Sequence, residues 1–157
     1  MRIGITGTPG TGKTTVSKLL TRDVIDLKKF AQERGLGEEK KIFHIDVESL
    51  DEELPEDCCV EGHLAHRLTL DYCIILRTRP DVLEERLRKR DYPEEKIREN
   101  VEAEAMDLIL SQASNQDFTV YEIDTTDVRP ETIAERIEEA IEKKEKRKGV
   151  VDWSSYI

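Results

Sequence analysis

Residues 7–14 form the segment whose residue types and spacing point most directly to chemistry. They read Gly-Thr-Pro-Gly-Thr-Gly-Lys-Thr, which fits the phosphate-loop pattern of two glycines separated by four residues and followed by Lys and Thr. Glycines let such a loop curl so that its N–H groups point inward, Lys13 would reach the β- and γ-phosphates, and the Thr14 hydroxyl can bind Mg²⁺. A glycine turn with a chance lysine is the alternative, but the predicted strand before the loop and helix after it favour nucleoside triphosphate binding.

A carboxylate on a neighbouring strand is the second requirement of such a site, because it orients Mg²⁺ and the water around it. The apolar run Cys-Cys-Val ends in Glu61, which is the candidate. Gly62 then keeps the backbone close, and His63 is near enough to orient a water or a substrate phosphate. A surface histidine, or a buried one with satisfied hydrogen bonds, is the other interpretation of His63 and the favoured one for His66.

Two arginines lie where ligands of open α/β sheets collect. Arg77 and Arg79 follow the fourth apolar segment, at the predicted carboxyl edge of the sheet. Either side chain could contact a phosphate there.

A cluster of cations precedes a short turn, after which a second long helix begins at Glu94. This pattern predicts a small hinged lid over 89–99, whose mobile cations would neutralise charge and exclude water during phosphoryl transfer. Arg90 is the first candidate, with Arg86 and Arg98 behind it. The alternative is that these arginines only complement the helix dipole and pair with neighbouring glutamates.

The elements that must position these residues alternate along the chain. Helical stretches with apolar residues at three-to-four spacing separate most of the short apolar segments, and Pro80, Pro93 and Pro130 mark three helix starts. The pattern predicts a parallel α/β sheet. Its five predicted strands are 3–6, 24–26, 58–61, 72–76 and 118–123.

The register is less clear between the second and third strands. A short helix over 27–34 is followed by a Gly-Leu-Gly break, a charged run and a further apolar segment at 42–45. We interpret this region as an insertion into the sheet topology.

Composition narrows the class of protein. The 157 residues suffice for a single domain over 1–157, and 37% hydrophobic residues in short bounded runs beside 38% charged residues predict a globular chain. No apolar run reaches the roughly 18 residues of a membrane span and the N-terminus is unlike a secretion signal, so we expect a cytoplasmic protein without membrane contact. Cys58, Cys59 and Cys73 are interpreted as reduced, buried strand residues.

The charge balance bears on partners. With 25 basic and 35 acidic residues, the formal net charge of −10 argues against a phosphate-tracking nucleic-acid surface and favours a basic partner. The acidic clusters at 46–57 and 99–107 are either solvated helix faces or a docking surface for a basic protein.

Several segments together resemble one family. They read Gly-Thr-Pro-Gly-Thr-Gly-Lys-Thr-Thr at 7–15, Glu-Gly-His-Leu-Ala-His at 61–66, Leu-Arg-Thr-Arg-Pro at 76–80, Arg-Lys-Arg-Asp-Tyr at 88–92, Glu-Asn-Val-Glu-Ala-Glu-Ala at 99–105, Tyr-Glu-Ile-Asp-Thr-Thr at 121–126 and Val-Asp-Trp at 151–153. Over nearly its whole length the chain resembles the archaeal branch of the isoenzyme-six type adenylate kinases.

The resemblance implies a P-loop NTPase fold of the nucleoside monophosphate (NMP) kinase type, with a five-stranded parallel sheet flanked by helices, an NMP-binding insertion over 23–45 and a small lid. It implies that Glu61 and His63 take Walker-B-like positions, that Arg90 is the lid arginine, and that Lys28, Lys29 and Arg77 bind the monophosphate. The residues that it implies for ATP are Gly10, Gly12, Lys13, Thr14, Thr15 and Arg90.

The implied activity is broad-specificity NMP kinase, ATP + AMP to 2 ADP, with ATPase activity. The implied role is late maturation of the small ribosomal subunit and rRNA processing, with transient binding to a basic ribosomal protein and little direct nucleic-acid contact. An assembly factor whose ATPase is primary, and a small-metabolite kinase of the shikimate or gluconate type, are the rival interpretations.

Three departures from the family pattern affect the site. The 20–24 connection is shorter than is usual, so the first helix or its loop must be trimmed. Lys29 stands where relatives carry an arginine, and a lysine cannot clamp a phosphate bidentately. Asp91 replaces a common glycine and would stiffen the lid hinge.

Overall fold

A computed structural model describes residues 1–38 and 44–157 of the chain. Its strands are β1 (Arg2–Gly7), β2 (Ile25–Asp26), β3 (Gly37–Glu38), β4 (His44–Ile45), β5 (Cys58–Glu61), β6 (Tyr72–Arg77) and β7 (Thr119–Asp124). Its α-helices are α1 (Lys13–Ser17), α2 (Leu27–Glu33), α3 (Val47–Glu53), α4 (Pro80–Lys89), α5 (Glu94–Ala105), α6 (Leu108–Ser114) and α7 (Pro130–Lys143), and short 3₁₀ turns η1 and η2 span Ala65–Arg67 and Ser154–Tyr156.

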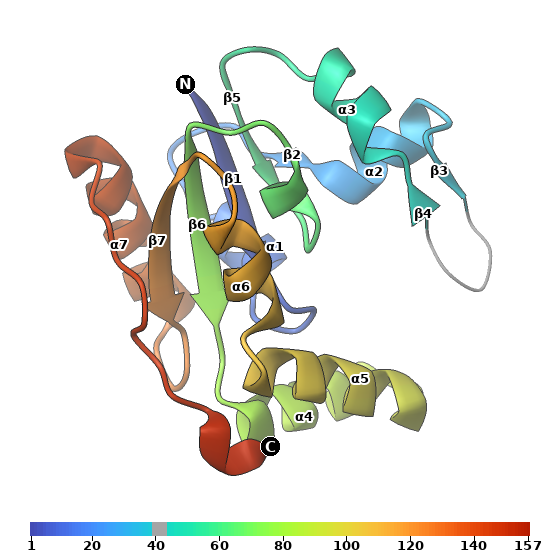
Figure 1. Ribbon diagram of the computed structural model, residues 1–157, viewed down its shortest axis with the longest axis vertical. Coiled ribbons are helices and arrows are strands. Elements are labelled where there is room, and N and C mark those ends of the chain that lie inside the picture. Colours follow the sequence, from blue (N-terminus) through green and yellow to red (C-terminus); the bar gives the residue numbers. More distant parts are fainter. Residues whose placement is uncertain (39–43) are drawn as a thin grey trace.

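Five of these strands form one parallel sheet in the order β2-β5-β1-β6-β7 (Figure 1). This confirms the predicted five-stranded parallel sheet, and each predicted strand overlaps an observed one. Beyond β7 the C-terminal segment continues the sheet edge, because Arg147 exchanges backbone hydrogen bonds with Val120 and Glu122. All five strands therefore end at the same edge, where a ligand site can be assembled.

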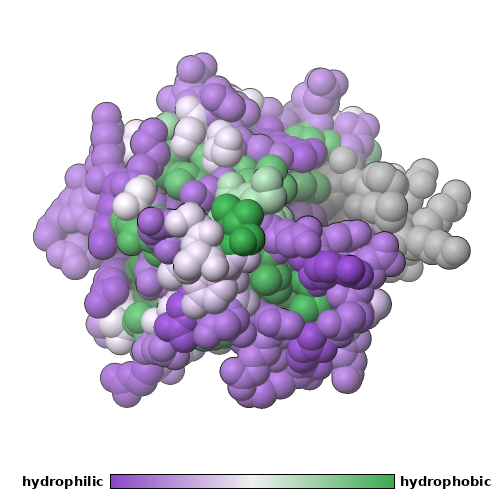
Figure 2. Space-filling view, turned by 60° about the horizontal axis from the view of Figure 1, so that its bottom comes forward, coloured by the Kyte–Doolittle hydropathy of each residue, from purple (hydrophilic) through white to green (hydrophobic). Residues whose placement is uncertain are grey.

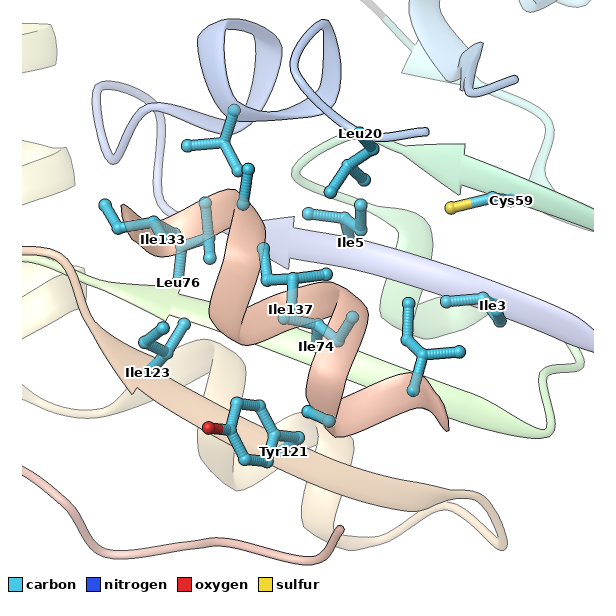
Figure 3. Close-up of a cluster of buried hydrophobic side chains, with 14 of the residues drawn as sticks. Ile3, Ile5, Leu20, Cys59, Ile74, Leu76, Tyr121, Ile123, Ile133 and Ile137 are labelled. Atoms are coloured by element: carbon cyan, nitrogen blue, oxygen red, sulfur yellow. The ribbon is translucent and has the colours of Figure 1, made fainter. Parts of the chain in front are cut away.

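Helices cover both faces of the sheet, as strands buried on both sides require. Alternate residues of β1 and β6, such as Ile5 and Ile74, pack with α1 and α7 into one core cluster (Figure 3). On the opposite face, Ile75 packs with Ala113 of α6, and Val60 packs with residues of α2 and α3. The apolar stripe predicted for the last helix is the face that α7 buries.

The first helix is short. α1 covers only Lys13–Ser17 and gives way to turns before β2. A short first helix is one of the two outcomes that the short 20–24 connection predicts.

The insertion between β2 and β5 contains two capped helices. Asp26 caps α2 by accepting a hydrogen bond from the Lys29 N–H, and Asp46 caps α3 in the same way with Ser49. Strands β3 and β4 pair antiparallel between the two helices. The predicted helix over 27–34 is confirmed. The middle of the insertion, 39–43, lies outside the described residues and includes the first half of the predicted apolar segment at 42–45, whose second half forms β4.

Helices α4 and α5 form a hairpin beyond the carboxyl ends of the strands (Figure 1). Leu83, Leu87 and Ile97 pack into a small core of their own between the two helices. Proline starts α4 at its first position and precedes α5, as predicted. Asp91 lies in the turn with a left-handed φ of 57°, a conformation that glycine adopts without steric cost.

The surface reflects the highly charged composition. Hydrophilic side chains cover most of the face in Figure 2, and small hydrophobic groups interrupt them. Across the described residues, no helix has the length and apolar character needed to cross a bilayer. All three cysteines are free thiols in strands, and Cys59 and Cys73 are buried as predicted, whereas Cys58 is half-buried.

Candidate active site

The phosphate loop follows β1 directly and encloses the Lys13 side chain. Gly10 and Gly12 adopt left-handed φ angles of 94° and 97°, which residues with a Cβ rarely adopt. The Lys13 ammonium donates hydrogen bonds to the carbonyl oxygens of Gly7 at 2.8 Å and Thr8 at 3.2 Å. The loop therefore holds its cation ready beside the space that the glycines leave open.

Burial sets the charge state of this lysine. Lys13 is only 9% exposed, and burial lowers the pKa of its ammonium to about 8, while the nearby Glu61 carboxylate opposes the shift and Arg90 adds to it. Lys13 is still mainly cationic at neutral pH. A cation that is poorly solvated gains more from an incoming phosphate than a hydrated one would.

Oxygen ligands suitable for a hard cation meet at the ends of β2 and β5. Thr14 Oγ1 donates to Glu61 Oε1 at 3.2 Å, and Asp26 is the register partner of Glu61 on the adjacent parallel strand. Burial raises the pKa of Glu61, and the charge of Asp26 raises it further. Two carboxylates and a hydroxyl this close fit a divalent cation, which would relieve the repulsion between the carboxylates.

These residues would supply only part of a metal coordination shell. Within the described part of the chain, no cluster of three or more His, Cys, Asp or Glu residues is arranged to hold a metal ion. Mg²⁺ suits such a site because it usually keeps several waters and takes further ligands from substrate phosphates.

The two histidines after Glu61 have different surroundings. His63 lines the cavity in front of the loop, and its side chain is exposed to solvent. Partial desolvation beside the loop lowers the pKa of its imidazole to about 4, and the positive charge of Lys13 adds to this shift. His66 is buried, with Nδ1 hydrogen-bonded to Thr6 Oγ1 at 3.2 Å and Nε2 to Gln112 Oε1 at 2.7 Å. The interpretation of His66 as a buried histidine with satisfied hydrogen bonds is confirmed. His63 is accessible from the cavity as a hydrogen-bonding group.

A first cavity of about 270 Å³ opens in front of the loop. Loop residues form its floor, and Asp26, Lys28, Glu61 and His63 line its wall. Tyr92 and Arg90 approach from the turn between α4 and α5. The cavity thus places anion-binding groups beside an aromatic side chain.

A second cavity of about 240 Å³ lies on the other side of the loop. Thr15, Val128 and Pro130 contribute to its lining, together with lid-helix arginines. It shares Gly10, Gly12 and Arg90 with the first cavity. The two cavities therefore meet at the loop, and a single arginine reaches both.

The predicted lid arginines have different positions. Arg90 ends α4 and lines both cavities. Arg86 lines the second cavity and donates to the Gly10 carbonyl oxygen at 3.3 Å. Arg98 lies on α5, outside the described lining of both cavities.

Arg77 does not lie at the predicted phosphate position. Its guanidinium is buried behind the loop, where it is ion-paired with Glu104, Asp107 and Glu122. The assignment of Arg77 to the monophosphate is therefore corrected, because three carboxylates already occupy its donors. Arg79 is half-buried and pairs with Asp81 at 2.6 Å.

The two insertion lysines point to different places. Lys28 lines the first cavity. Lys29 lines a separate hollow beside α1, which shares Thr14, Asp26 and Glu61 with the first. The structure thus brings Lys28, and not Lys29, to the cavity in front of the loop.

Sequence reasoning missed Asp26, Tyr92 and the segment 125–130. Asp26 had a usable signal, because it ends a predicted strand just as Glu61 does. Tyr92 and the segment 125–130 reach the cavities only through the way in which the chain folds back, which no local pattern reveals.

The fold and the loop define the class as a P-loop protein with the sheet and helix arrangement of small kinases. Solved structures of that kind superimpose on most of the chain. The deoxyadenosine kinase of M. mycoides with bound dATP matches with a TM-score of 0.56 at 18% identity, covering 90% of this chain and 100% of that one. The shikimate kinase of Acinetobacter baumannii in complex with shikimate matches with a TM-score of 0.60 at 15% identity, covering 93% and 95%. At these identities the likeness concerns the fold.

Sequence comparison is more specific. The model of the AAA domain family matches residues 3–107. Proteins named "Putative adenylate kinase" from Thermococcus kodakarensis and Methanocaldococcus jannaschii are each 44% identical, over 98% of this chain and 93% of theirs. The chain belongs to this archaeal family.

Proposed function

We propose that the protein is an ATP-dependent phosphotransferase that moves the γ-phosphoryl group of ATP to a nucleoside monophosphate, producing two nucleoside diphosphates. The observation that carries the proposal is the pair of cavities that meet at Gly10, Gly12 and Arg90. A hydrolase needs one nucleotide pocket and access for water, whereas transfer between two phosphates needs two pockets that converge on one point. The adenylate kinase name of the archaeal relatives supports the same reaction.

Each cavity suits one substrate. We assign the monophosphate to the first cavity, where Lys28 and Tyr92 offer a cation and a stacking surface. The base of ATP is assigned to the second cavity, between Thr15 and Val128. The phosphates would then lie along the glycines, with the γ-phosphoryl group between the two cavities.

Catalysis in this arrangement is by positioning and charge, without a covalent enzyme intermediate. Lys13 would leave the loop carbonyls to bind the β- and γ-phosphates, and Arg90 would stabilise charge on the transferred group from the lid side. His63 would hydrogen-bond the acceptor phosphate. Thr14 and Glu61 would hold Mg²⁺, which neutralises charge on the phosphates when it is bound.

A Lys13→Ala variant tests this function. We expect it to keep the circular dichroism spectrum and oligomeric state of the wild type, and to lose phosphoryl transfer from ATP to AMP. Full transfer activity in a folded Lys13→Ala protein would contradict the site assignment. A screen of NMPs, shikimate and gluconate as acceptors distinguishes NMP kinase from metabolite kinase.

A second candidate function is assembly of the small ribosomal subunit, with ATP hydrolysis driving release from a basic ribosomal protein. One observation favours it: the acidic side chains of the 46–57 cluster largely face solvent, as a docking surface for a cation-rich partner requires. The exposed members are Asp46, Glu48, Glu52, Glu53, Glu56 and Asp57. The 99–107 cluster is less suitable, because Glu104 and Asp107 pair internally with Arg77.

Two measurements separate this role from the kinase role. Turnover of ATP that does not depend on AMP favours the ATPase. The docking surface is favoured if a basic ribosomal protein binds and if this binding weakens as the salt concentration is raised. Charge-neutral substitutions at Glu52 and Glu53 should then abolish the binding.

A further inference from the structure

A buried ion network lies directly behind the phosphate loop. Arg77 Nε donates to Glu104 Oε1 at 2.9 Å, its Nη1 donates to Glu122 Oε2 at 2.6 Å, and its Nη2 pairs with Asp107. Arg77, Glu104 and Glu122 are each no more than 3% exposed. Three carboxylates thus surround one guanidinium, at the end of β6 and beneath the loop.

Glu104 extends this network to the loop itself. Its Oε2 accepts a hydrogen bond from the Thr78 N–H at 3.0 Å, and the Thr8 hydroxyl donates to its Oε1 at a longer 3.5 Å. Glu104 lies in the last turn of α5. One carboxylate therefore connects the lid hairpin, the end of β6 and the second residue of the phosphate loop.

Other side chains hold the loop from the same side. Arg86 of α4 donates to the Gly10 carbonyl oxygen at 3.3 Å. The Thr125 hydroxyl lies 3.4 Å from the Thr11 carbonyl oxygen and closer, at 2.9 Å, to the Arg77 carbonyl oxygen. Thr78 and Thr125 hydrogen-bond to each other at 2.8 Å. Glu104 differs from these supports because it carries a full negative charge.

The negative charge of Glu104 is energetically unfavourable at this buried position. Burying an ion removes it from water at a large desolvation cost, and one guanidinium cannot neutralise three carboxylates. A negative charge behind a loop that binds a polyanion also opposes ligand binding. Apolar residues of similar volume would avoid both costs, so a carboxylate here is best explained by what its oxygens hold in place.

We propose that Glu104 is a positioning residue of the phosphate loop. Held by Arg77, it fixes the Thr8 hydroxyl and so the Thr8 peptide, whose carbonyl oxygen is one of the two acceptors of the Lys13 ammonium. The loop is thereby kept in its anion-binding shape before the nucleotide arrives, and the ordering cost of binding falls. The inference rests on the proposed function only in placing the nucleotide triphosphate at this loop.

Glu104→Gln tests the proposal against a matched control. Glutamine keeps the shape but removes the charge that binds Arg77, and we expect the dissociation constant for magnesium ATP to rise about tenfold. Asp107→Asn removes a carboxylate from the same guanidinium without contact to the loop, so its dissociation constant should stay within twofold. Equal changes in the two variants, or no change in Glu104→Gln, would overturn the proposal. Isothermal calorimetry measures both.

A second pair of variants keeps the test decisive if Glu104→Gln does not fold. Thr8→Val removes only the hydroxyl at nearly constant volume and should weaken magnesium ATP binding several-fold, whereas Thr8→Ser should restore it. In the double variant Thr8→Val, Glu104→Gln the two effects should overlap. A Thr8→Val protein that binds ATP like the wild type, or effects that multiply, would show that the contact positions nothing.

Kinetics separate this proposal from the proposed function. If the wild-type protein transfers phosphate to AMP, the Glu104→Gln variant should have a lower kcat/KM for ATP than the wild type. Its KM for AMP should change less than twofold. If the wild type binds ATP without transferring phosphate, the NMP kinase function fails and the calorimetric comparison still decides the role of Glu104. An unchanged kcat/KM for ATP in Glu104→Gln would count against the positioning role alone.

Discussion

Alanine substitutions at Gly10 and Gly12 of the phosphate loop should differ in which property they impair more, stability or nucleotide binding. A Cβ at Gly10 would lie 2.9 Å from Leu83 Cδ1 and 3.0 Å from Leu87 Cδ2, in the core of the lid hairpin. A Cβ at Gly12 would meet no protein atom within 4 Å. Gly12 lines both cavities, so a methyl group there occupies space beside the expected phosphates.

The stability costs follow from this geometry. Either alanine is held at positive φ, which costs about 1–2 kcal/mol. Gly10→Ala also overpacks Leu83 and Leu87, which adds about 1–3 kcal/mol. With a Tm shift of about 2–4 °C per kcal/mol for a chain of this size, Gly12→Ala should lower Tm by about 2–8 °C, and Gly10→Ala by about 4–20 °C.

Nucleotide binding should rank the two variants in the reverse order, because Gly12→Ala should weaken binding more than Gly10→Ala does. If the Gly12→Ala methyl group prevents two loop amides from reaching a phosphate, about 3 kcal/mol is lost and affinity for magnesium ATP falls on the order of 100-fold. Differential scanning calorimetry and isothermal titration of the two variants measure both quantities. Wild-type affinity in Gly12→Ala would refute the placement of the phosphates, and equal Tm losses would refute the packing of α4 on Gly10.

Two further predictions concern the lid and the buried histidine. Arg90→Ala should lower kcat for phosphoryl transfer about 10³-fold. Arg88→Ala should change kcat less than twofold, because Arg88 pairs with acidic residues on the outer face of the hairpin. A coupled ADP assay compares the two variants, and similar losses of kcat would contradict the role of Arg90. Burial lowers the pKa of His66 from 6.5 in the folded state. Below pH 6.5 the unfolded state therefore binds more protons than the folded state, so the free energy of unfolding decreases as the pH falls. Urea unfolding between pH 7 and 5 should therefore show a steeper loss in wild type than in His66→Gln, and parallel slopes would contradict it.

The strands and the phosphate loop were predictable because their signals are local. Five apolar segments, each bounded by polar residues or turns, gave the sheet, and the spacing of Gly7, Gly12 and Lys13 fixed the loop before any tertiary contact was considered. The rule that ligand-binding residues gather at the carboxyl ends of parallel strands then indicated the sheet edge at which the site lies. Glu61 could be placed at that edge for the same reason.

Arg77 shows why the rest could not be predicted. An arginine at the end of a strand is an equally good candidate for a phosphate or for buried carboxylates, and its sequence neighbours do not distinguish the two. Its partners come from positions 104, 107 and 122, so their convergence depends on how α5 returns to the sheet. Lys28 and Lys29 pose a similar problem, since one residue of helical rotation decides which cavity each side chain lines.

The phosphate loop and the base of the lid form one packed unit. Leu83 and Leu87 of α4 lie against Gly10, and Arg86 binds the carbonyl oxygen of the same glycine. Because this contact fills the space over Gly10, the base of α4 cannot move away from the loop without opening a cavity in the lid core. Beyond Leu87 the helix ends and Asp91 takes its left-handed φ, so Arg90 lies in the part of the hairpin that this contact does not hold.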